Sequence, residues 1–211
     1  QLDKALKIGR NANITKPINP IHNIFVAGMG GSGIGANFVS ELISEECKIP
    51  FLIGKGYSIP GYIGKNTLAI ASSYSGNTEE TLEAFESLLK TGAKIVVVSS
   101  GGKLIDLAKT LGLDYIQVPS GSPSPRACLG YSLVQQLFIL SKLGLITEKI
   151  IREVETAAEL IKKEQEDIRF RAERIAPVMK GKIPVIYTSD RMEAVAVRFR
   201  QQINENGKSL C

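Results

Sequence analysis

Residues Leu68–Thr78 read LAIASSYSGNT: four apolar residues run directly into a turn of hydroxyl side chains and one glycine. A short apolar run bounded by turn residues is typical of a strand buried in a parallel sheet. Helical periodicity follows over Glu79–Thr91. The stretch therefore predicts a strand, a tight polar turn and a helix in succession, which is the repeating unit of an α/β fold.

The same unit recurs before and after this stretch. We expect further helices at Gly35–Ser44 and Leu104–Leu111. Strands are expected at Ile24–Ala27, Phe51–Ile53, Leu68–Ala71, Ile95–Val98 and Tyr115–Val118. Because short apolar strands alternate with helices, the sequence predicts an α/β protein with a doubly wound, mostly parallel five-stranded sheet.

The chain divides into three expected parts. Residues 1–145 form a first domain that begins with an N-terminal helix. Residues 146–181 form a linking helix, because Glu148–Arg174 is charged, amphipathic and poor in turn residues. Residues 182–211 hold a strand at Lys182–Tyr187 and a helix from about Met192 to Asn206. One strand and one helix cannot bury a core, so we expect the beginning of an incomplete second domain.

Composition excludes several classes of protein. No apolar run approaches the length that spans a bilayer, and we expect no membrane association. The formal charge is +5, the basic residues are scattered, and aromatic residues make up 6% with no Trp, so we expect no nucleic-acid partner. Cys47, Cys128 and Cys211 are widely spaced and odd in number, which fits neither a disulfide framework nor a zinc site. We therefore expect a cytoplasmic protein with reduced thiols.

A glycine loop follows the first expected strand. Gly28–Gly33 satisfies G-x-G-x-x-G between a strand and a helix, a pattern found in dinucleotide-binding proteins. Such sites also have a carboxylate at the end of the second strand, and Gly54-Lys55-Gly56 has none. Lys55 leaves open an NADP-binding alternative, and tight helix–strand packing is another explanation of the glycines.

The turn after Leu68–Ala71 gives a more specific signal. Hydroxyls at Ser73, Ser75 and Thr78, together with the amides at a helix N-terminus, can surround a phosphate monoester without a metal. A capping box formed by Asn77 and Glu80 is an alternative explanation of the turn. Capping leaves the hydroxyls of Ser73 and Ser75 unexplained, and we favour phosphate binding.

Three stretches resemble a known family. They are Met29–Gly35, Ser73–Thr81, and the segment Ser124–Ala127 paired with Gln201–Asn206. The first two resemble sugar isomerase (SIS) domains. The third is more specific and is similar to the bifunctional phosphoglucose/phosphomannose isomerases of archaea and some bacteria. The resemblance covers nearly the whole chain and implies a flavodoxin-like SIS domain followed by the start of a second one.

The resemblance also implies roles for individual residues in binding. Gly31 and Ser32 would lie near the sugar, while Ser73, Ser75 and Thr78 would hold the phosphate. Fructose 6-phosphate, glucose 6-phosphate and mannose 6-phosphate would be the ligands. No cofactor and no metal is implied.

Two further residues receive catalytic roles from the resemblance. Arg126 would stabilise the developing enediolate, and Glu205 would move a proton between C1 and C2. Aldose–ketose isomerisation needs one such base and one cation where negative charge develops. A helix cap for Arg126 and a solvated helix-end charge for Glu205 remain as alternatives.

The sequence departs from the family after Glu205. The histidine that helps open the sugar ring and a C-terminal lysine cannot be assigned, since His22 lies in no catalytic motif. We expect either a fragment of an isomerase or a natural truncation, with activity near zero for this chain alone. A non-catalytic SIS module that binds a sugar phosphate is the second hypothesis. We also expect a homodimer, because the apolar helix Leu129–Leu143 needs cover.

Overall fold

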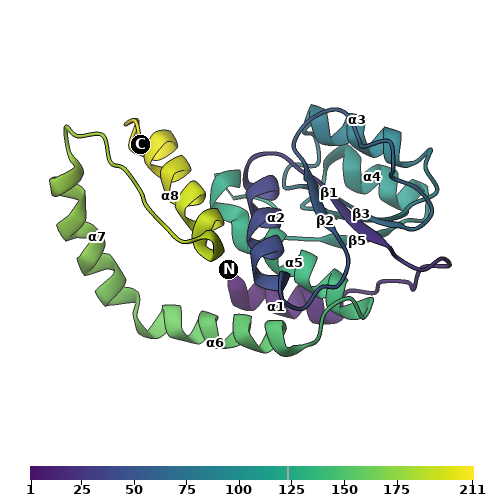
Figure 1. Ribbon diagram of the computed structural model, residues 1–211, viewed down its shortest axis with the longest axis horizontal. Coiled ribbons are helices and arrows are strands. Elements are labelled where there is room, and N and C mark those ends of the chain that lie inside the picture. The colour runs from purple at the N-terminus through teal and green to yellow at the C-terminus, as the bar shows by residue number, and fades with distance from the viewer. Residues whose placement is uncertain (123) are drawn as a thin grey trace. The chain divides into compact units, whose positions relative to one another are not determined.

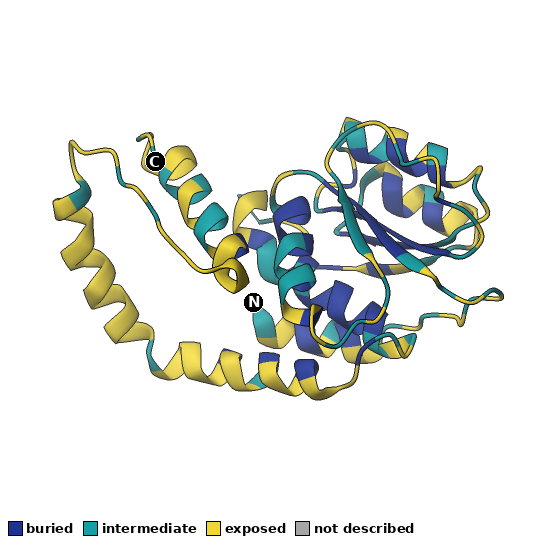
Figure 2. Ribbon diagram, viewed as in Figure 1, coloured by how far each residue is buried: buried dark blue, intermediate teal, exposed yellow. Residues whose placement is uncertain are grey.

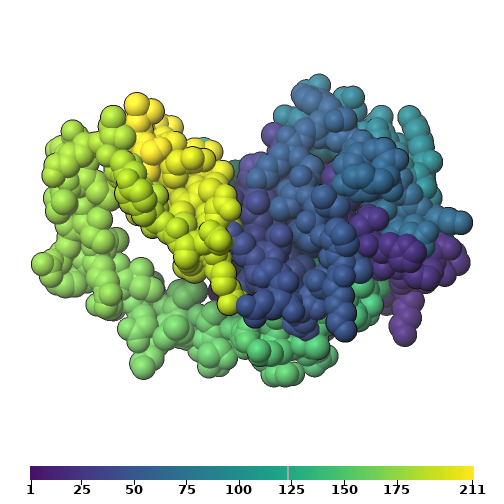
Figure 3. Space-filling model, in the orientation of Figure 1, coloured from purple at the N-terminus to yellow at the C-terminus, as the bar shows by residue number. Residues whose placement is uncertain are grey.

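The computed structural model describes residues 1–122 and 124–211, and it divides into two compact units, Gln1–Val154 and Glu155–Cys211 (Figure 1). In the space-filling view the described atoms of the first unit form one closely packed body (Figure 3). The second unit is built from helices and extended chain. The two units are described separately below.

A five-stranded sheet is the centre of the first unit. The strands are β1 (Asn23–Ala27), β2 (Phe51–Gly54), β3 (Thr67–Ser73), β4 (Lys94–Ser99) and β5 (Asp114–Gln117). Every neighbouring pair is parallel, and the order is β2-β1-β3-β4-β5. This is the flavodoxin-like order of doubly wound proteins. The predicted α/β fold and its five strands are confirmed, and the sheet is wholly parallel among the described residues.

Helices cover both faces of this sheet (Figure 1). One face packs against α1 (Leu2–Asn11), α2 (Gly30–Ile43) and α5 (Leu129–Lys142), and the other against α3 (Glu79–Leu88) and α4 (Gly102–Thr110). The alternation along β3 shows why two layers form: Leu68 and Ile70 enter the first core, and Ala69 and Ala71 enter the second. Side chains that point to opposite faces need cover on both.

The apolar helix α5 is covered within a single copy of the chain. Nine of its residues are buried, and it packs against α1 and α2. A partner subunit is therefore not needed to shield it, and the apolar composition of Leu129–Leu143 is no argument for a homodimer.

The second half of the chain differs from two predictions. The expected single linking helix is two helices, α6 (Lys149–Lys163) and α7 (Gln165–Met179), which meet at Glu164. The predicted strand at Lys182–Tyr187 is wrong, because this described segment forms no ladder. An extended segment becomes a strand only when its N–H and C=O groups pair with a neighbour. The predicted final helix is confirmed as α8 (Glu193–Asn206), preceded by the short 3₁₀ turn η2 (Asp190–Met192).

Among the described residues, every helix is too short or too polar to cross a bilayer.

Candidate functional site

Two loops meet where β1 and β3 end. In a flavodoxin-like sheet these neighbouring strands flank the point where the strand order reverses, which is where such folds bind ligands. A Cβ atom at Gly28 would lie 2.9 Å from the carbonyl oxygen of Ser72. The glycine loop therefore touches the end of β3, and Gly31 and Ser32 line one small cavity together with Tyr74 of the hydroxyl turn.

The hydroxyl turn, Ser73–Thr78, is internally ordered and is called the cradle below. The Ser73 and Thr78 hydroxyls lie 2.8 Å apart, and the Gly76 amide donates to Ser73 Oγ over 3.1 Å. The Asn77 amide donates to Ser75 Oγ over 3.2 Å. Because Ser75 Oγ accepts, its O–H hydrogen can be donated outward, and one hydrogen of the Ser73–Thr78 pair is also available. The cradle can thus offer two hydroxyl donors without changing shape.

The N-terminus of α3 closes the cradle. Its N-cap is Thr78, and within the described residues no side chain caps it. The carboxamide of Asn77 instead accepts a hydrogen bond from the Lys103 amide in the first turn of α4, over 3.0 Å. The alternative of a capping box between Asn77 and Glu80 is therefore wrong. The amides of the first turn of α3 are left to an anion or to water.

Acidic side chains surround the outside of this helix end. Glu79 and Glu80 lie in the first turn, where carboxylates complement the helix dipole. Their negative charge, with a smaller contribution from Glu83, raises the pKa of the exposed Tyr57. An anion at this helix end would therefore depend on directed hydrogen bonds, because the carboxylates of Glu79 and Glu80 are close to it.

The loop after β4, Ser99–Gly102, packs against the cradle and supports it. Gly76 has φ +70°, and a Cβ atom there would overlap the carbonyl of Gly101. The Leu104 amide donates to the Gly76 carbonyl over 3.0 Å, and the Ser99 hydroxyl donates to the Gly101 carbonyl over 2.9 Å. Sequence reasoning missed this support. The signal was the second serine–glycine turn, Ser99–Gly102, at the end of the neighbouring strand.

The structure shows which glycines of the glycine loop are required by packing or backbone conformation and which are not. A Cβ at Gly33 would lie 2.5 Å from the Gly28 carbonyl oxygen, and Gly30 has φ +50°. Backbone packing and conformation explain these positions and Gly28. Gly31 differs, because a Cβ there would meet the Pro125 carbonyl oxygen only at an ordinary 3.6 Å. Protein contacts do not require glycine at this position, and its role near a sugar stays a prediction.

Lys55, the residue behind the NADP alternative, lies after β2. Its ammonium donates to the Asn37 carboxamide on α2 over 2.7 Å. This contact ties the lysine to the protein's own helix. No observation on the described residues specifically favours a dinucleotide.

Arg126 lies in the 3₁₀ turn η1 (Pro125–Cys128) and is exposed. Its Cα would be 3.9 Å from a Cβ at Gly31, so this turn and the glycine loop touch. The side chain of Gln1 donates to the Ala127 carbonyl over 2.7 Å and accepts from the Gly130 amide over 2.8 Å. The structure thus brings Gly31, the cradle and the Arg126 turn to one edge of the first unit.

A family model for the SIS domain matches residues 18–139, more than half of the chain. The chain belongs to the SIS domain family. A second model, the bacterial phospho-glucose isomerase C-terminal SIS domain, matches residues 169–211. Both matches agree with the resemblance given by the sequence motifs.

Curated relatives make the resemblance narrower. A bifunctional phosphoglucose/phosphomannose isomerase from Caldicellulosiruptor bescii is 39% identical over 99% of this chain and 63% of its own length. One from Aquifex aeolicus is 36% identical over 93% of this chain and 59% of its own length. The chain thus spans about three fifths of the length of these relatives. The predicted resemblance to the bifunctional isomerases is confirmed.

A solved structure agrees on the fold of this SIS protein. The C-terminal domain of glucosamine-fructose-6-phosphate aminotransferase from Francisella tularensis superposes with a TM-score of 0.77. The match covers 100% of this chain and 66% of the other, at 14% identity. Identity this low supports a common architecture and nothing finer.

Glu205 belongs to the second unit of the SIS protein and is exposed on α8. Polar side chains surround the motif: Arg198 donates to the Gln201 carboxamide over 3.3 Å, and the carboxamides of Gln202 and Asn206 lie 2.7 Å apart. Gln201 and Glu205 share one helix face, since they are four residues apart. The other six predicted site residues all belong to the first unit.

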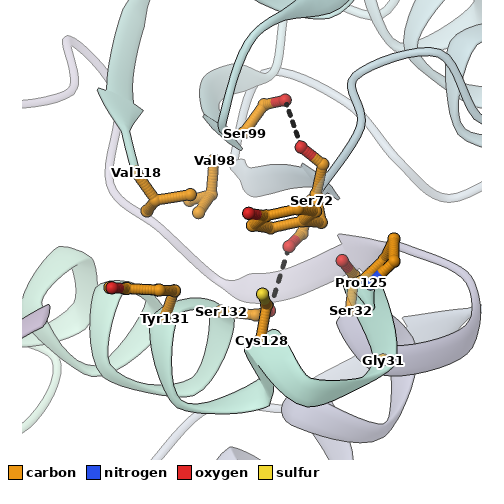
Figure 4. Close-up of a pocket in the computed structure, with 11 residues that line it drawn as sticks. Gly31, Ser32, Ser72, Val98, Ser99, Val118, Pro125, Cys128, Tyr131 and Ser132 are labelled. Carbon is orange, nitrogen blue, oxygen red and sulfur yellow. Dashed lines mark hydrogen bonds between the residues drawn. The ribbon is translucent and has the colours of Figure 1, made fainter. Parts of the chain in front are cut away.

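A small cavity lies beneath the glycine loop and the Arg126 turn (Figure 4). Its volume of about 10 Å³ is room for one water molecule at most, so a hexose would have to lie above it. Ser72 and Ser132 join hydroxyls across it at 3.1 Å, and Gln136 donates to Ser132 over 3.0 Å. Ser72 belongs to the stretch that the sequence singles out, whereas Ser132 and Gln136 of α5 were missed, because polar residues inside an apolar helix carry no local signal.

Among residues 1–122 and 124–211, no group of three or more His, Cys, Asp or Glu side chains is placed to hold a metal ion.

Proposed function

We propose that this chain is part of an aldose–ketose isomerase that interconverts glucose 6-phosphate and mannose 6-phosphate with fructose 6-phosphate. The observation that carries the proposal is the meeting of three loops at the β1–β3 edge. A phosphate cradle, a glycine that no packing contact requires, and an arginine turn lie together there. Homologues with 36–39% identity carry the corresponding name, which supports the same reaction.

The cradle would bind the phosphate of the sugar. Hydroxyls of Ser73, Ser75 and Thr78 would donate to its oxygens, together with the amides of the first turn of α3. Gly31 and Ser32, in the first turn of α2, would lie against the sugar carbons. The ligand would enter as the dianion, which hydrogen-bond donors at a helix N-terminus favour.

The chemical step would be a proton transfer between neighbouring carbons. The Glu205 carboxylate would take the proton from C2 of the aldose and return it to C1, while a proton moves between the oxygens on C1 and C2. Negative charge accumulates on these oxygens in the enediolate intermediate. The Arg126 guanidinium would stabilise that charge. Neither oxidant nor reductant is consumed, since the two carbons exchange oxidation states.

A non-catalytic sugar-phosphate-binding module is the second candidate. It is favoured by the division of the site residues, because every proposed phosphate and sugar contact belongs to the first unit. Such a module would need no base, and Glu205 would then have no catalytic role. Turnover by the chain would exclude this second candidate, and turnover that persists in Glu205→Gln would exclude the proposed base.

We further propose a homodimer in the cytoplasm. The family resemblance supports the dimer, and three unpaired cysteines suit a reducing compartment. Light scattering that gives the mass of one chain would contradict the dimer.

Calorimetric titration with fructose 6-phosphate tests the binding proposal. We expect binding to the unmodified chain and a loss of at least about 10-fold in affinity for Ser73→Ala and Ser75→Ala, since each removes a charge-assisted hydrogen bond. Ser44→Ala, at the far end of α2, is the matched control and should bind normally. Equal affinity in all four proteins would refute the cradle.

A coupled assay of fructose 6-phosphate formation tests catalysis. If the chain turns over, Glu205→Gln should abolish turnover while leaving phosphate binding intact. Normal turnover by this variant would remove Glu205 from the mechanism. Binding without any turnover by the unmodified chain is expected under both candidates, since activity near zero is expected for this chain alone.

A further inference from the structure

Tyr74 lies in the middle of the cradle, but its side chain leaves it. The phenol donates a hydrogen bond to the carbonyl of Pro119 over 3.0 Å. The same oxygen accepts one from the amide of Ser122 over 3.2 Å. Donor and acceptor of the hydroxyl are both used, and both partners are backbone groups more than 40 residues away.

The other end of Tyr74 is held equally firmly. Its carbonyl accepts hydrogen bonds from the Ser100 amide over 3.0 Å and from the Ser100 hydroxyl over 2.6 Å. The ring packs against the core shared by the sheet and α5. Tyr74 is therefore a stiff connection, with its backbone fixed to the end of β4 and its hydroxyl fixed to the segment after β5.

That segment leads directly to Arg126. The Val118 amide donates to the Ser99 carbonyl, and after this bond the described residues 119–122 form no helix or strand. Further along, the Ser122 hydroxyl and the Ala127 amide both donate to the Ser124 carbonyl, over 3.2 and 2.9 Å. The hydrogen bonds of Tyr74 thus restrain the segment that leads along the chain to the Arg126 turn.

We propose that Tyr74 is a positioning residue that holds the Arg126 turn at a set distance from the phosphate cradle. The inference rests on the proposed function, in which Arg126 contacts the sugar part of the ligand. Tyr74 contacts neither the phosphate nor the reacting carbons. It acts through the backbone of residues 119–122. Because this segment is already held in place, a ligand bound by Ser73 and Ser75 finds the Arg126 guanidinium in position, and the loop does not have to become ordered on binding.

Hydrogen exchange on the 211-residue chain without ligand tests the connection itself. Tyr74→Phe keeps the ring and removes the hydroxyl, so peptides covering residues 118–128 should exchange about 5- to 30-fold faster, which corresponds to one or two lost hydrogen bonds. Peptides from β3 should exchange as before, which shows that the variant is folded. Tyr62→Phe, at a half-exposed tyrosine of the same unit, should change neither region. Unchanged exchange over 118–128 in Tyr74→Phe would overturn the proposal.

Titration with two probes tests what the connection does. Inorganic phosphate uses the cradle alone, and its affinity should be the same in Tyr74→Phe and in the unmodified chain. 5-Phosphoarabinonate places a carboxylate where enediolate charge would develop, and its affinity should fall about 5- to 30-fold in Tyr74→Phe. Arg126→Ala should weaken the same probe, and the double variant should be little weaker than Arg126→Ala alone.

The outcomes separate the two proposals. If the unmodified chain binds neither probe, the proposed function fails, and the exchange experiment still decides whether Tyr74 holds the segment. If Tyr74→Phe weakens both probes equally, the Tyr74 hydroxyl is needed for phosphate binding itself, and its role in positioning Arg126 is overturned.

Discussion

Helices α5 and α7 have nearly the same length, 14 and 15 residues, and opposite surroundings. Nine residues of α5 are buried, whereas none of α7 is, although α7 carries Phe170, Ile175 and Val178. Figure 2 shows this contrast as a buried helix in one unit and an exposed one in the other. Helix α5 lies between a sheet and two other helices, and α7 belongs to a unit without a sheet. Apolar side chains stabilise a fold only where another layer excludes water from them.

The largest expected change in stability comes from replacing one phenylalanine in each unit by alanine. Phe85→Ala empties a site that is 0% exposed between α3 and the sheet, and should cost about 3–5 kcal/mol of unfolding free energy. Phe170→Ala, at 56% exposure on α7, should change it by less than about 0.5 kcal/mol. Urea unfolding of the two variants measures both values. A cost above 2 kcal/mol for Phe170→Ala, a threshold of roughly four times the surface expectation, would show that α7 is covered in solution.

A pair of glycines sharpens the description of the first unit. Gly76 and Gly92 have nearly equal φ angles, +70° and +72°, so alanine at either carries the same backbone strain, about 1–2 kcal/mol. Only at Gly76 does the new Cβ also overlap the Gly101 carbonyl. Gly76→Ala should therefore be less stable than Gly92→Ala by about 1–3 kcal/mol. It should also lose phosphate binding, which calorimetry would detect. Equal stability would mean that the cradle can move away from the β4 loop.

Two ion pairs, one in each unit, allow the same comparison of buried and exposed surroundings, with smaller expected changes in stability. Lys94 and Asp114 are 2.7 Å apart with side chains 18% and 11% exposed, and Thr15 donates two hydrogen bonds to the same carboxylate oxygen. Asp114→Asn should cost about 1 kcal/mol or slightly more. Glu173→Gln breaks the exposed pair with Arg169 on α7 and should cost no more than about 0.5 kcal/mol. Thermal unfolding measures the loss of stability in each variant. If the loss caused by Asp114→Asn disappears at high salt, the Lys94–Asp114 pair is exposed to solvent.

The smallest expected effect is on pH dependence. Burial, followed by the neighbouring Cys128 thiol, raises the pKa of Tyr74 above its ordinary value of 10.0. The neutral phenol is the form that folding favours, because the unfolded chain releases this proton at lower pH than the folded one. The contribution of Tyr74 to stability is therefore present below pH 10.0 and is lost as the pH rises through the raised pKa.

Comparison of the unmodified chain with Tyr74→Phe isolates this contribution, since the other titrating groups are common to both. Urea midpoints measured between about pH 8 and pH 11 should converge as the pH rises. A difference that stays constant across that range would indicate that the hydroxyl is already exposed in the folded protein.

The sequence predicts much of the first unit correctly and less of the second. Strand β3 and the cradle after it are readable because a buried strand, a tight turn and a helix each leave a local pattern. The segment Lys182–Tyr187 has the composition of a strand, but composition does not provide a partner to pair with. Asn77 likewise has the spacing of a cap for its own helix and caps α4 instead. The geometry of the folded loops decides which amide its side chain reaches.

The sequence by itself determined the class of the fold, the place of the cradle and the resemblance of Arg126 and Glu205 to catalytic residues. These depend on residue types within a few positions of one another, where periodicity and turn chemistry act. Tertiary structure alone decided that Gly31 touches the Arg126 turn and that Tyr74 reaches Pro119. Contacts between such distant segments depend on how the parallel strands bring their carboxyl ends to one edge, and no short stretch of sequence encodes that distance.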